Sequence, residues 1–98
     1  MSLSPPRIVC AAIKFQNKKG ETMVVASPRH MDMTCRYILN QLDVSPRRVE
    51  VEEGFIDQHG AFYTRLDAWE IAERNGQIMR RCGGDGRGGY GLFSENLY

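Results

Sequence analysis

The chain has 98 residues, a net charge of +1, 42% hydrophobic residues and 26% charged residues. These values are typical of an ordinary soluble globular domain, and no apolar run is long enough to span a bilayer. Because the charge is near neutral, nothing predicts a broad surface for long nucleic acids. The opening MSLSPP lacks the pattern of a signal peptide, so we expect one cytoplasmic domain over residues 1–98 that gains stability by self-association.

Two strands and a helix are predicted in the first half of the chain. The apolar run RIVCAAIKF (residues 7–15) is typical of a buried strand, and ETMVVA (residues 21–26) follows a turn-like segment as its hairpin partner. From Ser27 onward, apolar residues recur at helical spacing as far as Asp43. Because Ser-Pro is a favourable helix start, we expect Ser27 to cap this helix and Arg29 and His30 to lie in its first turn.

A second hairpin and a second helix are predicted next. Apolar and acidic residues alternate before the turn DQHG, so residues 49–63 are expected to form the hairpin. Thr64 is a candidate helix cap with Asp67 three positions later, and Asn75-Gly76 is a typical helix end. The expected buried positions of this helix are Leu66, Ala68, Trp69, Ile71 and Ala72. The order of elements predicts an α+β fold with a small, mostly antiparallel sheet and two helices packed on it.

The last nineteen residues divide into a loop and a tail. Residues 80–91, RRCGGDGRGGYG, contain six glycines and three arginines, which predicts an irregular Gly/Arg-rich loop. This loop is either a mobile segment or a nest of backbone N–H groups around a phosphate. The tail LFSENLY (residues 92–98) carries four large apolar residues, so we expect it to dock on its own domain or on a neighbouring subunit.

No catalytic or metal-binding set emerges from the sequence. The cysteines Cys10, Cys35 and Cys82 lack C-x-x-C spacing, and the first two are expected to be small buried hydrophobes while Cys82 is expected at the surface. The histidines His30 and His59 have no second ligand at a recognised metal spacing. We therefore predict a protein without enzymatic activity, cofactor or metal.

The arginines suggest an anionic ligand. Ten of the thirteen basic residues are Arg, which reflects either phosphate recognition or genome composition. Arg29 and Arg65 fall at predicted helix starts, where a cation is unfavourable unless an anion lies beside it. Asp67 could neutralise Arg65, and a bound phosphate is the alternative. Phe55, which follows a glycine in the hairpin, is either a core residue or a platform on which a base stacks.

The residues GFIDQHGAFYTRLDAWEIAERNGQI and LFSENLY, supported by RIVCAAIKF and by PRH at residues 28–30, resemble the phage Thoeris anti-defence proteins of the first type. The resemblance implies a phage protein in the host bacterial cytoplasm that sequesters glycocyclic ADP-ribose, and in some members cyclic oligonucleotides, without cleaving them. It implies pockets between subunits of a homodimer or a higher assembly such as a hexamer. It implies that Arg29 and one loop arginine, whether Arg80, Arg81 or Arg87, hold phosphates and that Phe55 stacks on adenine. With the candidates above, the predicted ligand-binding residues are Arg29, His30, Phe55, Arg65, Arg81 and Arg87.

Two other classes of function are compatible with the sequence. The tail and the Phe55 hairpin could form an apolar surface that binds a host protein, which would make the chain an interaction module or inhibitor. The basic, flexible segment RRCGGDGRGG could bind RNA, although the near-neutral net charge disfavours this function.

Overall fold

The structure, a computed structural model, describes residues 4–16, 20–29, 33 and 51–98. The described strands are β1 (Ile8–Gln16), β2 (Thr22–Ser27), β3 (Val51–Asp57) and β4 (Phe62–Thr64). They form one antiparallel sheet in the order β2-β1-β3-β4. The α-helix α2 (Arg65–Arg74) and a short 3₁₀ helix, η1 (Ser94–Asn96), follow. The predicted α+β class with an antiparallel sheet is therefore confirmed.

The first hairpin forms as predicted, but the start of the expected first helix is wrong. Ser27 is the last residue of β2, and Pro28 and Arg29 lie in a bend rather than in a helical turn. The Ser27 hydroxyl donates to the Arg29 carbonyl oxygen at 2.6 Å instead of capping helical N–H groups. Apart from Met33, the rest of the expected helix, including His30, Cys35 and the positions up to Asp43, lies outside the described residues, so one of the two predicted helices is found.

The second hairpin and the second helix agree closely with the prediction. The Thr64 side chain accepts a hydrogen bond from the Asp67 amide at 3.2 Å, and Gly76 adopts a left-handed φ of 67° just beyond the helix. Four of the five predicted core positions of α2 are buried, whereas Leu66 is 50% exposed. Leu66 is the exception because it falls outside the arc that Ala68, Trp69 and their neighbours share on the helix surface.

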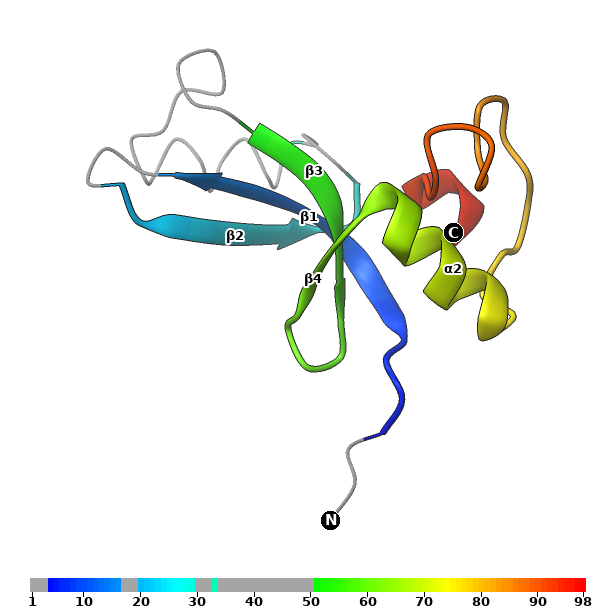
Figure 1. Cartoon of the computed structure of the whole chain (residues 1–98), viewed down its shortest axis with the longest axis horizontal. Coiled ribbons are helices and arrows are strands. Elements are labelled where there is room, and N and C mark those ends of the chain that lie inside the picture. Colours follow the sequence, from blue (N-terminus) through cyan, green and yellow to red (C-terminus); the bar gives the residue numbers. More distant parts are fainter. Residues whose placement is uncertain (1–3, 17–19, 30–32, 34–50) are drawn as a thin grey trace.

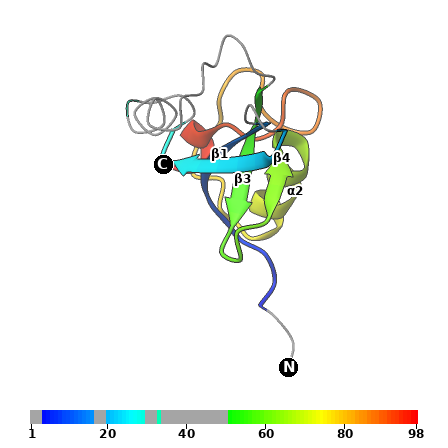
Figure 2. The same cartoon turned by 90° about the vertical axis from the view of Figure 1, so that its left-hand side faces the viewer.

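The core lies between one face of the sheet and α2. Phe55 pairs with Ala11 on one side and with Tyr63 on the other, so these three side chains share the face that packs against the helix. In Figures 1 and 2, α2 lies beside the β3–β4 hairpin, with the loop and the tail next to it and β2 at the far side of the sheet.

The tail packs on its own domain, which is one of the two arrangements that the sequence predicts. Leu92 is fully buried and Leu97 is 9% exposed, and both belong to the same core cluster as Trp69. The Leu92 amide also donates to the Arg65 carbonyl oxygen at 2.8 Å, which ties the tail to the start of α2. The C-terminal segment therefore completes the hydrophobic core.

Candidate functional site

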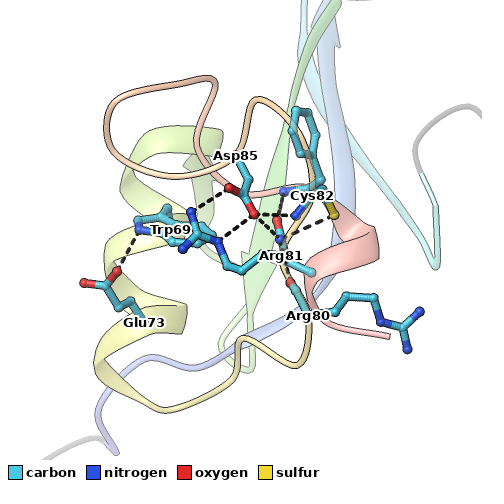
Figure 3. A network of polar contacts seen from close by, with 8 residues as sticks. Trp69, Glu73, Arg80, Arg81, Cys82 and Asp85 are labelled. Carbon is cyan, nitrogen blue, oxygen red and sulfur yellow. Dashed lines mark hydrogen bonds and ion pairs between the residues drawn. The ribbon is translucent and has the colours of Figure 1, made fainter.

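The Gly/Arg-rich loop is organised around the carboxylate of Asp85, whose side chain is only 4% exposed (Figure 3). Arg81 donates to both carboxylate oxygens, from Nε at 2.9 Å and from Nη2 at 2.7 Å. The Cys82 amide and the Asn96 side-chain amide donate to Oδ2 at 2.7 and 2.8 Å. One carboxylate thus joins the start of the loop to the C-terminal tail.

Asn96 extends this network into the tail. Its side chain is fully buried, and besides Asp85 its Nδ2 contacts the Arg80 carbonyl oxygen at 2.9 Å and the Cys82 sulfur at 3.5 Å. Its Oδ1 accepts from the Phe93 amide at 2.8 Å. A buried side-chain amide without hydrogen-bond partners destabilises the fold, so Asn96 has to keep these contacts. They hold the tail against the loop.

Arg81 is part of this bracing. Its guanidinium carbon lies 5.1 Å from the centroid of the Trp69 ring, and the Trp69 indole N–H donates to Glu73 at 3.0 Å. Arg81 was one of the candidate loop arginines for phosphate binding, but in the structure its guanidinium contacts a carboxylate and an aromatic face (Figure 3). In this arrangement Arg81 attaches the loop to α2.

The same contacts shift the ionisation of the pair. Hydrogen bonds from Arg81, the Cys82 amide and Asn96, together with the positive charge of Arg81, outweigh burial and hold the pKa of Asp85 far below its ordinary value. Asp85 raises the pKa of Arg81 in return. Asp85 is therefore a charged acceptor at neutral pH, and its role here is to order the loop.

The glycines of the loop allow close packing and left-handed backbone. Gly84, Gly86 and Gly91 have φ of 85°, 90° and 91°, and a Cβ on Gly91 would lie less than 3.0 Å from the Arg65 carbonyl oxygen. A Cβ on Gly89 would lie equally close to the Gly84 carbonyl oxygen. The loop is packed, which argues against a mobile segment, and six of its N–H groups donate within it, which leaves fewer for a phosphate nest. The N–H groups that donate within the loop are those of Cys82, Asp85, Gly86, Gly89, Tyr90 and Gly91.

Arg87 and Tyr90 project from the tip of the loop. Gly86 and Gly91 exchange two backbone hydrogen bonds of 3.0 Å, and Gly89 donates to the Gly86 carbonyl oxygen at 3.1 Å, so the four residues between the paired glycines form a tight turn. Arg87 and Tyr90 are its first and last residues. The Arg87 side chain is 72% exposed and Tyr90 is 73% exposed. The tip therefore offers a cation and an aromatic ring to solvent.

Both arginines from the predicted helix starts bind the tail. Arg65 donates to the Leu92 carbonyl oxygen at 2.8 Å and to Glu53 at 2.7 Å, and it lies over the Phe93 ring at 5.1 Å. Arg29 donates to the Tyr98 carbonyl oxygen, and its guanidinium carbon lies 4.9 Å from the centroid of the Tyr98 ring. Acceptors within the chain therefore occupy the place that the sequence assigned to a ligand anion.

The remaining predicted site residues do not join the tip. Phe55 is fully buried in the core, so its ring could stack on a base only if the core opened. His30 lies outside the described residues. The apolar surface that a protein-binding function required is also largely used inside the fold, because Phe55, Leu92 and Leu97 are all core residues.

Sequence reasoning missed Asp85, Asn96 and Tyr90. The one available signal was an aspartate among glycines, a residue type that often bonds to nearby backbone N–H groups.

Cys82 is partly buried and free, as is Cys10, whose pKa is raised by burial. In the part of the chain that the structure describes, no three His, Cys, Asp or Glu residues gather as metal ligands, and no helix has the length and apolarity to cross a membrane.

These features define a small α+β protein in which a braced Gly/Arg-rich loop and a docked tail lie beside one helix. The family model described as phage T4 y16D protein matches residues 7–98. The chain belongs to this family and is a phage protein, as the resemblance implied. No curated protein and no solved structure matches it.

Proposed function

We propose that this phage protein binds and sequesters a nucleotide signal of the host cell without cleaving it, and that the ligand binds at the tip of the Gly/Arg-rich loop. The observation that carries the proposal is the exposed guanidinium of Arg87 and the exposed ring of Tyr90 on one tight turn. A nucleotide combines an anion with a flat base, and these are the groups that arginine and an aromatic ring bind. A phage gains from such a sponge if the nucleotide activates host defence.

The proposal differs from the sequence-based hypothesis in its residues. Arg87 is kept because its ion pair with Glu70, at 3.4 Å, is exposed to solvent. Arg29, Arg65 and Arg81 instead donate to acceptors of the tail or the loop, and Phe55 is buried. Glycocyclic ADP-ribose, the ligand that the resemblance implies, and cyclic oligonucleotides both fit this chemistry, because each carries phosphates and at least one base. Binding by two or more subunits in the host cytoplasm belongs to the same proposal.

Native mass spectrometry and calorimetry with four probes test the proposal. The probes are glycocyclic ADP-ribose, cyclic ADP-ribose, ADP-ribose and cyclic di-AMP. We expect at least one to bind with a defined stoichiometry and to be recovered intact after the protein is denatured. Recovery of a cleaved product would contradict sequestration, and failure of all four probes to bind would contradict nucleotide binding.

A further inference from the structure

We propose that Tyr90 and Arg87 divide recognition of the nucleotide between them, with the base stacking on the Tyr90 ring and a phosphate binding the Arg87 guanidinium. This inference rests on the proposed function and assigns the two parts of the ligand to two side chains. It also gives Glu70 a role, as the carboxylate that the phosphate displaces from Arg87.

Tyr90 is ordered by contacts with Gly84, while most of its surface is exposed to solvent. Its amide donates to the Gly84 carbonyl oxygen at 2.7 Å, and a Cβ on Gly84 would lie 3.4 Å from the ring. The ring therefore rests against a glycine backbone while 73% of the residue stays exposed. An exposed aromatic ring on an ordered backbone offers a face on which a base can stack. Because the turn is already ordered, little conformational entropy is lost when a base stacks on it.

Arg87 lies at the other end of the same turn. Its Nη2 is 3.4 Å from Oε1 of Glu70 on α2, and both side chains are more than half exposed, at 72% and 58%. An exposed ion pair of this length is weak and is screened by salt. A phosphate, which can accept two hydrogen bonds from one guanidinium, competes well for such a cation. Because the Gly86–Gly91 pair closes the turn, Arg87 and Tyr90 leave the same short segment of backbone.

The test measures affinity by calorimetry for whichever of the four probes binds the wild-type protein most tightly. Tyr90→Ala should weaken binding by roughly 5- to 150-fold, as expected for the loss of one stacked base, and Tyr90→Phe should bind nearly as the wild type does. Arg87→Ala should weaken binding by roughly 10- to 100-fold. Glu70→Gln should strengthen it by roughly two- to fivefold, because the competing carboxylate is gone.

Two controls separate this inference from a folding defect and from the proposed function. Arg74→Ala removes one exposed positive charge from the end of α2 and should leave the affinity unchanged. The thermal midpoints of the Tyr90 and Arg87 variants should stay within a few degrees of wild type, because both side chains are exposed. If a probe binds the wild type and both alanine variants equally well, the inference is wrong and so is the placement of the ligand at the loop tip, while sequestration of a nucleotide stands. If no probe binds the wild type, both are wrong.

Discussion

The glycines of the loop give a direct test of whether this segment is a packed part of the fold. Gly91 has a φ of 91°, and a Cβ there would overlap the backbone of Arg65. Gly88 belongs to the same loop, but a Cβ on it would meet nothing within 4 Å, and its φ is not in the left-handed region. Gly91→Ala and Gly88→Ala are therefore a matched pair in which the same methyl group is added to the same loop.

The expected difference follows from three contributions. Left-handed backbone costs a residue with a Cβ about 1–2 kcal/mol, and overlap with packed backbone costs about 1–3 kcal/mol more. Loss of freedom in the unfolded chain offsets about 0.4–1 kcal/mol of this. Gly91→Ala should therefore lower the free energy of unfolding by about 1–4 kcal/mol, whereas Gly88→Ala should leave it unchanged or raise it by up to about 1 kcal/mol.

Urea titration and calorimetry measure both variants. For a domain of this size a loss of 1 kcal/mol lowers the midpoint by about 4–8 °C, so the Gly91 variant should melt roughly 5–30 °C below wild type. A mobile loop would respond alike to both substitutions. Equal midpoints for the two variants would therefore refute the packing argument.

Three further predictions concern the bracing of the loop and the tail. Asp85→Asn should lower the thermal midpoint at pH 7, and the difference from wild type should shrink in acid. Because the pKa of Asp85 is depressed in the folded state, its carboxylate stabilises the fold above about pH 4, and this contribution is lost as the pH falls further. A difference that stays constant between pH 7 and pH 2 would contradict this linkage. Arg81→Met should change the fluorescence of Trp69 by removing the guanidinium from its ring, and an unchanged emission spectrum would argue against the stacking. Leu92→Ala should lower the free energy of unfolding by about 2–5 kcal/mol, whereas Met79→Ala, at a residue that is 74% exposed, should change it by less than about 0.5 kcal/mol; similar urea midpoints for these two variants would mean that the tail does not complete the core.

The regular elements could be predicted because local sequence determines them. The apolar run of β1 follows from its burial in the sheet, and the α2 boundaries follow from Thr64 and Gly76. The N-cap interpretation of Ser27 failed because the same Ser-Pro pair can end a strand in a bend. Whether Ser27 ends a strand or caps a helix depends on the preceding residues, and these pair with β1 as far as Ser27 itself.

The organisation of the loop could not be predicted because it depends on contacts between distant residues. Asp85 and Asn96 are eleven positions apart, and Gly91 is required by its approach to Arg65, twenty-six positions earlier. From the sequence alone, a glycine indicates only conformational freedom of the backbone. The sequence does not show which atoms a Cβ at that position would contact. The same holds for Phe55, since only the packing of α2 and the tail decides that its ring is covered.

The sequence suggested that an anionic ligand balances the charge of Arg29 and Arg65, but the acceptors of both arginines lie within the chain. Arg65 does lie in the first turn of a helix, and the Glu53 carboxylate and the Leu92 carbonyl oxygen satisfy it. For Arg29 the premise itself fails, because the residue lies in a bend. The two arginines instead contact the aromatic rings of the tail, Tyr98 and Phe93.

Amide hydrogen exchange followed by NMR tests most directly whether the loop is a fixed platform. The amides of Tyr90, Gly91 and Leu92 donate to backbone carbonyl oxygens of Gly84, Gly86 and Arg65. They should therefore exchange far more slowly than in an unfolded peptide, and Asp85→Asn should speed the exchange of Tyr90 and Gly91. Exchange of these amides at unfolded-peptide rates in the wild-type protein would contradict a braced loop and remove the support on which Tyr90 and Arg87 depend.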